Sequence, residues 1–128
     1  MKRSILLDTH PMYSYEIAKS ETDVKNIDDI VEHFKVKVQE NPEAVFITVF
    51  DHYKHTKELN GEILERIVDA KNFLFCFGHT IKNIEILAFR PKSIAMCETK
   101  DSFVLEFLET PRPEVNAWMQ EWIKELKK

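Results

Sequence analysis

The spacing of hydrophobic residues changes several times along this chain, and each spacing predicts a different element. Between Val24 and Val38 the apolar residues recur at three- and four-residue steps, which is the pattern of an amphipathic helix. Ser20 or Thr22 is expected to cap the start of this helix, and Asn41-Pro42 is expected to end it.

Strands are predicted where β-branched and aromatic residues concentrate. These segments are Met12–Ala18, Ala44–Phe50, Phe73–Phe77, and the two arms of a hairpin, Ser93–Glu98 and Phe103–Glu109. The second and third are apolar at both odd and even positions, as in strands that are covered on both faces. We therefore expect these two strands to be central in the sheet and adjacent to each other.

Two further helices are predicted. The turn signal Asn60-Gly61 precedes a short apolar-periodic segment at 62–70, and Pro111 and Pro113 precede a closing helix. The apolar stripe of the closing helix is Val115, Trp118, Met119, Trp122, Ile123 and Leu126. The segment 80–89 is ambiguous between a helical turn and irregular chain.

These elements define a fold class. Their order is strand, helix, strand, short helix, strand, hairpin and helix, which predicts an α+β fold with a mainly antiparallel sheet of about five strands and helices packed on one face. A length of 128 residues suits a single domain spanning 1–128, with residues 1–10 as a flexible tail.

Charge and hydropathy limit the kinds of partner that this protein can have. The chain has 22 acidic and 18 basic residues, interspersed, for a net charge of −4, which disfavours nucleic acid and anionic lipid as partners. No segment approaches the ~20 apolar residues of a membrane span, and the apolar run Ile5–Leu7 is too short for a signal peptide. We therefore expect a cytoplasmic protein that does not enter membranes. In that compartment Cys76 and Cys97 are expected to be buried, unreactive thiols.

Four residues have the chemistry of zinc ligands: His52, His55, Cys76 and His79. One geometric objection weakens a four-ligand site, because Cys76 within a strand points away from His79 unless Gly78 bends the chain. A looser site for a divalent metal would use His52 and His79 with Asp51. The alternative is that the histidines are solvated residues at strand ends.

A second candidate is an anion site. Arg90 and Lys92 flank Pro91, and a rigid turn with two cations can hold a carboxylate or a phosphate. The alternative is a solvated strand entry.

The segment FDHYKHTKEL, the strand end FGH and the hairpin SIAMCETKDSFVLEFLETP together resemble the domain-of-unknown-function 302 family, from Tyr13 to Pro111. The resemblance implies a compact α+β domain that forms a homodimer, and it places Asp51, His52, Gly78 and His79 near one another. It implies no reaction, and His79 stands at a position where asparagine is expected.

Three functions remain open from the sequence. The favoured one is a binding module whose polar cleft holds a metal ion or a small anionic ligand, with contacts from Asp51, His52, Gly78, His79 and Arg90. The second is an enzyme in which His52 or His79 is the general base and Arg90 orients a small acidic substrate. The third is a structural or partner-binding protein without a small-molecule site. The first two require the side chains of His52 and His79 to converge.

Overall fold

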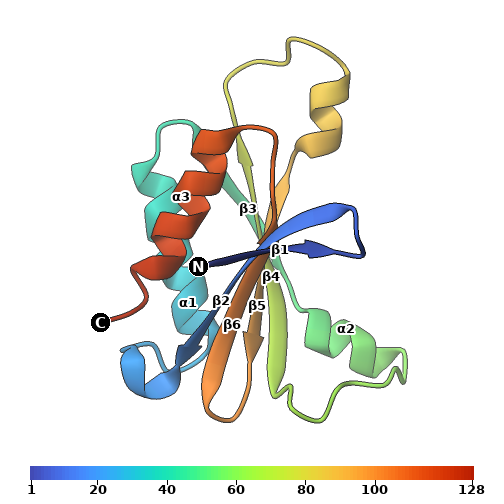
Figure 1. Ribbon diagram of the computed structural model, residues 1–128, viewed down its shortest axis with the longest axis vertical. Helices are drawn as coiled ribbons and strands as arrows, with labels where there is room; N and C mark the ends of the chain where they lie inside the picture. The colour runs from blue at the N-terminus through green and yellow to red at the C-terminus, as the bar shows by residue number, and fades with distance from the viewer.

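The computed structural model describes residues 1–128 as one six-stranded antiparallel sheet, with the two long helices on one of its faces (Figure 1). The strand order is β1-β2-β6-β5-β4-β3. The elements in chain order are β1 (Lys2–Leu6), β2 (His10–Ala18), η1 (Lys19–Glu21), α1 (Ile27–Glu40), β3 (Ala44–Phe50), α2 (His52–Glu58), β4 (Asp69–Phe77), η2 (Glu85–Phe89), β5 (Lys92–Glu98), β6 (Ser102–Leu108) and α3 (Pro113–Lys124). The α+β class and the antiparallel sheet are confirmed, and the two long helices α1 and α3 pack on one face as predicted (Figure 1).

The first long helix, α1, starts later than predicted. Asn26 is its cap, and its side chain accepts a hydrogen bond from the backbone N–H of Asp29 at 2.9 Å. Thr22 lies before the helix: its hydroxyl accepts from the N–H of Val24 at 3.3 Å and donates to the carbonyl of Leu126 at 2.6 Å, and its backbone pairs with Lys127. The predicted end before Asn41-Pro42 is confirmed.

The closing helix α3 begins at Pro113 as predicted, and its apolar stripe covers the sheet beside α1. Its residues Val115, Met119, Trp122 and Ile123, with Leu126 just beyond it, are buried. The ring of Trp122 meets Phe75 of β4 edge to face at 5.3 Å between centroids. This layer of helix on sheet forms a core of 19 buried hydrophobic residues.

The opposite face of the sheet has no covering layer of long helices. The strand registers place Asn72, Ala95, Glu106, Ser14 and Lys2 in one row across five strands of this face. Figure 1 shows α2 and the segment containing η2 on this side, one at each end of the sheet. We call this surface the open face.

The two cysteines were expected in the core but line the open face instead. Each alternates with core residues along its strand: Cys76 lies between Phe75 and Phe77, and Cys97 follows Met96. Both are free and half-buried. Burial raises the pKa of the Cys97 thiol, which disfavours the reactive thiolate.

Three other expectations differ from the structure. Lys2–Leu6, expected in a tail, form edge strand β1, which pairs with β2. The helix predicted at 62–70 is absent, and the helix lies instead at His52–Glu58, where Asp51 caps it by accepting from the N–H of Lys54 at 3.0 Å. Ala44–Phe50 does form β3, but at the outer edge of the sheet rather than in its centre.

The hairpin strands β5 and β6 separate near Lys92. Their pairing runs from Glu98 opposite Phe103 to Ala95 opposite Glu106. In the separated region, the Lys92 ammonium donates to the carbonyl of Leu108 at 2.8 Å. Burial lowers the pKa of Lys92 below its ordinary value of 10.5.

This lowered pKa predicts a pH dependence of stability. Between the folded pKa of Lys92 and 10.5, this residue binds more protons in the unfolded chain than in the folded one, so Lys92 contributes a rise in the free energy of unfolding with pH in that window. We expect Lys92→Met to remove this rise, and the exposed control Lys100→Met to keep it. Urea unfolding of the three proteins from neutral pH to about 10.5 measures the difference. Equal slopes in the wild type and Lys92→Met would contradict the prediction.

Candidate functional site

The antiparallel pairing of β3 and β4 separates the two predicted histidines. Ala44 pairs with Phe77 at one end of these strands, and Phe50 pairs with Asn72 at the other. His52 follows Phe50 and His79 follows Phe77 by two residues, so the two imidazoles lie at opposite ends of the strand pair. The prediction that they converge is therefore wrong, as is the placement of Asp51 and His52 beside Gly78 and His79.

At the first end, the predicted residues are engaged in local contacts. Nδ1 of His52 lies 3.0 Å from Oδ1 of Asn72, whose Nδ2 donates to the Ser93 hydroxyl at 3.1 Å. The rings of His52 and His55 are 6.3 Å apart between centroids, on one turn of α2. The carboxylate of Asp51 is occupied by capping that helix.

The four-ligand metal site is not assembled. His52 and His55 lie on α2, whereas Cys76 lies within β4 and His79 beyond its far end. No group of three or more His, Cys, Asp or Glu side chains in the structure is arranged to hold a metal ion.

At the other end, Gly78 and Arg90 come together as a site. Gly78 has φ +90°, a conformation that L residues rarely adopt, and it turns the chain out of β4. The Arg90 guanidinium packs directly against it: a Cβ built at position 78 would lie 2.5 Å from Nη2 of Arg90. The same guanidinium stacks on the ring of Phe77, 5.2 Å from its centroid.

The hydrogen bonds of Arg90 leave one side of the guanidinium free. Nη1 donates to the carbonyl of Thr80 at 2.9 Å. Nε is buried and has no hydrogen-bond partner, and Nη2 donates to no protein atom. Nε–H and Nη2–H point the same way, and together they match the two oxygens of a carboxylate. The free pair of donors is thus the pair suited to bidentate binding.

Arg90 also lines a mainly apolar cavity of about 280 Å³, which we call the Arg90 cup. Its walls come from the end of β4, the η2 segment and the approach to α3. The lining residues are Phe77, Asn83, Glu85, Ile86, Phe89, Arg90, Thr110, Pro111 and Arg112. The approach to α3 is held by buried Asn116, whose side chain donates to the carbonyl of Thr110 and accepts from its N–H, both at 2.9 Å.

Arg90 is the one cation of the cup without a carboxylate partner. Arg112 pairs with Glu43 and Glu114, both at 2.6 Å, and these carboxylates raise its pKa. Lys92, the other cation of the predicted anion turn, is held at Leu108 and does not line the cup. Of the two cations predicted to form an anion site at this turn, only Arg90 is therefore available.

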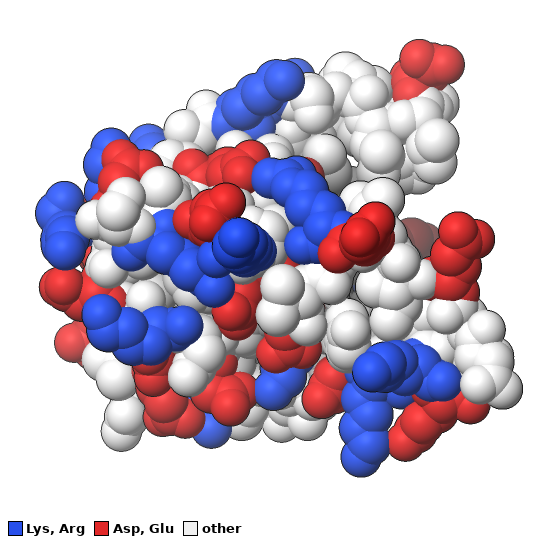
Figure 2. All heavy atoms as spheres, turned by 90° about the horizontal axis from the view of Figure 1, so that it is seen from below, with Lys and Arg blue, Asp and Glu red and all other residues white.

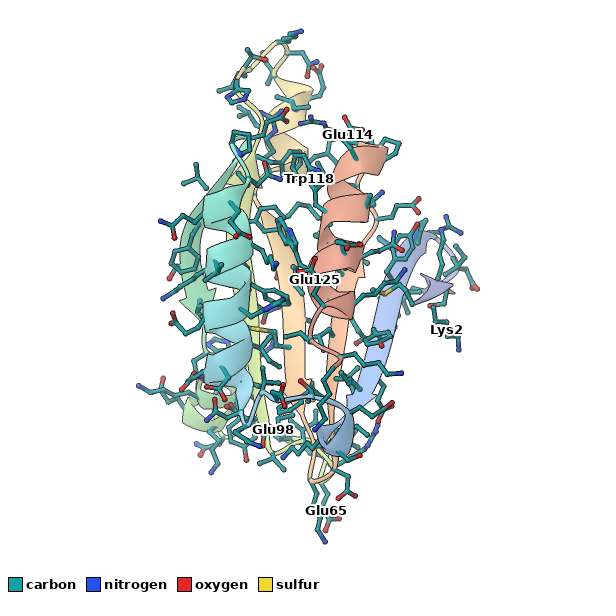
Figure 3. All side chains as sticks on the ribbon, turned by 90° about the vertical axis from the view of Figure 1, so that its left-hand side faces the viewer. Lys2, Glu65, Glu98, Glu114, Trp118 and Glu125 are labelled. Atoms are coloured by element: carbon teal, nitrogen blue, oxygen red, sulfur yellow. The ribbon has the colours of Figure 1, made fainter.

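Elsewhere on the surface, opposite charges offset each other. Figure 3 shows Trp118 and Glu125 between α1 and α3, in a groove that also contains Glu40, Glu43 and Glu121. Lys37 forms an ion pair with Glu125 there, and Arg112 forms an ion pair with Glu43. Figure 2 shows acidic and basic side chains interspersed on the face that it presents. The lining of the groove keeps an excess of acidic residues, with four glutamates and one lysine. The face in Figure 2 is not a broad surface of one sign.

Sequence reasoning named Gly78, His79 and Arg90 but missed the apolar walls of the cup. The available signal was the number of apolar residues in the segment before Arg90, which includes the lining residues Ile86 and Phe89 and the exposed Ile81, Ile84 and Leu87. An ordinary surface connection has fewer of them, so a run of this kind in an unassigned segment indicates a binding surface.

The geometry thus defines an α+β protein with a single-layer sheet and a small apolar cup lined by Arg90, whose buried Nε has no hydrogen-bond partner. The chain belongs to the family of unknown function DUF6858, whose profile matches residues 1–128. That family, rather than the domain-of-unknown-function 302 family, is the one that the comparison identifies. No match was found among curated proteins or solved structures. No helix of the structure combines the length and apolarity that crossing a membrane requires.

Proposed function

We propose that this protein is a binding module for a small ligand that carries one carboxylate on an apolar body, held in the Arg90 cup. The observation that carries the proposal is the buried, unpartnered Nε of Arg90 at an apolar cavity. A buried donor without an acceptor costs about 1–3 kcal/mol, so such groups are rare in folded proteins. A ligand carboxylate would provide the missing acceptor.

The charge of the cup favours a carboxylate over a phosphate. Only one guanidinium edge is free, and Glu85 on the rim opposes a second negative charge. The chain also lacks a glycine-rich loop, since Gly61 and Gly78 are its only glycines.

The size of the cup limits the ligand. A volume of about 280 Å³ corresponds to roughly nine water molecules at ~30 Å³ each. A ligand of roughly ten non-hydrogen atoms fits this space. Ile86 and Phe89 would contact its apolar body, while its carboxylate meets Arg90.

Three probes test this chemistry: octanoate, 1-octanol and inorganic phosphate, each titrated into ¹⁵N-labelled protein. We expect octanoate to shift the amide resonances of Gly78, Thr80 and Ile86. Octanol should bind at least about tenfold more weakly, because it lacks the charged acceptor. Phosphate should leave these resonances unchanged.

Substitution of Arg90 distinguishes the effect of its paired N–H donors from the effect of its positive charge. Arg90→Lys retains the positive charge but loses the paired donors, and should weaken octanoate binding about tenfold or more. Arg66→Lys is the matched control, because Arg66 pairs with Glu16 outside the cup, and it should bind like the wild type. Equal binding of octanoate and octanol, or octanoate shifts confined to other residues, would refute the proposal.

A further inference from the structure

The strand β3 differs from every other strand of the sheet in having no charged residue. Its sequence is AVFITVF. Each of the other five strands contains at least one charged side chain: Lys2 and Arg3 in β1, Glu16 in β2, Asp69 and Lys71 in β4, Lys92 and Glu98 in β5, and Glu106 in β6.

This uncharged strand lies at the edge of the sheet, where its outer backbone groups have no strand partner. Its side chains are exposed as well: Val45 is 66% exposed, Ile47 47% and Phe50 40%. Edge strands usually carry charges, prolines or bulges that prevent association with another chain. Here the only such device is the register shift at Ile47.

The opposite edge shows the usual protection. β1 has only five residues, and among them are Lys2 and Arg3. The sequence of β3 is that of a strand covered on both faces, which is why it was predicted to be central. In the single chain β3 is not covered in this way, since its outer edge and most of one face are exposed.

We infer that two copies of this chain associate through the outer edges of their β3 strands, with Val45, Ile47 and Phe50 at the contact. Identical strands that pair antiparallel about a two-fold axis give each copy the same new backbone hydrogen bonds. No like charges meet along the strands, because β3 has none. This inference is independent of the proposed ligand.

The helix next to β3 supports a second copy as the partner. Lys35 of α1 lies over the ring of Phe46, 5.0 Å from its centroid, and it pairs with Glu32 at 3.4 Å. Lys35 therefore lies beside the strand, and its partner Glu32 lies three residues earlier on α1. A two-fold contact can set the Glu32 of each copy against the Lys35 of the other, whereas a flank of one sign would repel its own copy.

Sedimentation equilibrium over micromolar to millimolar protein concentrations tests the inference. The wild type should reach twice the 15.2 kDa mass of one chain. Val45→Lys should raise the dimer dissociation constant at least tenfold. Val36→Lys is the matched control, because Val36 is 51% exposed on α1 and points away from the sheet, and it should associate like the wild type.

Amide hydrogen exchange of the wild type gives a test without substitutions, which decides the matter if Val45→Lys does not fold. Exchange in β3 should slow as the protein concentration rises, while exchange in β1 stays the same. A wild type that remains monomeric at all concentrations overturns the inference and points to a different partner for this edge. Equal weakening by Val45→Lys and Val36→Lys, or protection confined to β1, also overturns it.

Discussion

A chain that ends at Arg112 is expected to be unfolded at room temperature. The missing segment contributes five buried hydrophobic residues to the single core: Val115, Met119, Trp122, Ile123 and Leu126. Truncating one buried residue of this size to alanine typically costs 2–5 kcal/mol, and whole domains are stable by only about 5–15 kcal/mol. Losing all five exceeds what such a fold can withstand. Far-ultraviolet circular dichroism and the loss of a cooperative thermal transition measure the result.

The two tryptophans of α3 provide a graded version of this experiment. Trp122 is buried against Phe75, so Trp122→Ala should lower the free energy of unfolding by about 3–5 kcal/mol. Trp118 is half-buried beneath the guanidinium of Arg112, so Trp118→Ala should have a clearly smaller effect. A truncated chain that melts like the full chain, or equal effects of the two substitutions, would show that α3 is not part of the core.

Gly78→Ala is expected both to destabilise the fold and to abolish octanoate binding. The residue has φ +90°, where a side chain adds strain of order 1–3 kcal/mol. The new Cβ would also lie 2.5 Å from Nη2 of Arg90, so the guanidinium must shift from its present position against Phe77. Urea unfolding measures the first effect, and titration with octanoate measures the second.

Introducing Gly78→Ala into an Arg90→Ala variant separates the backbone strain at residue 78 from the steric conflict with Arg90. With the guanidinium removed, Gly78→Ala should cost less than in the wild type, because only the backbone strain remains. The same cost in both backgrounds would show that Arg90 does not pack against Gly78. Octanoate binding by Gly78→Ala at wild-type strength would contradict the assignment of Arg90 as the ligand contact.

Local pattern explains which elements were predicted correctly. The periodic apolar residues of α1 and α3 and the hairpin of β5 and β6 depend on neighbours close in sequence, so the residues themselves specify them. The missed helix α2 is also local: Asp51 is a normal cap, but the residues after it have no apolar stripe. Periodicity cannot detect a short helix of that kind.

The sequence by itself determined the α+β class, the long helices, the hairpin, and an apolar β3 that suits a covered position. Only the tertiary structure decided which strands pair and in which direction. That choice put β3 at an edge, sent His52 and His79 to opposite ends, and brought Arg90 against Gly78 beside Thr110 and Pro111. The physical reason is that strand order depends on how segments distant in sequence bury their surfaces together. The periodicity of hydrophobic residues within one strand does not specify which strands lie beside it.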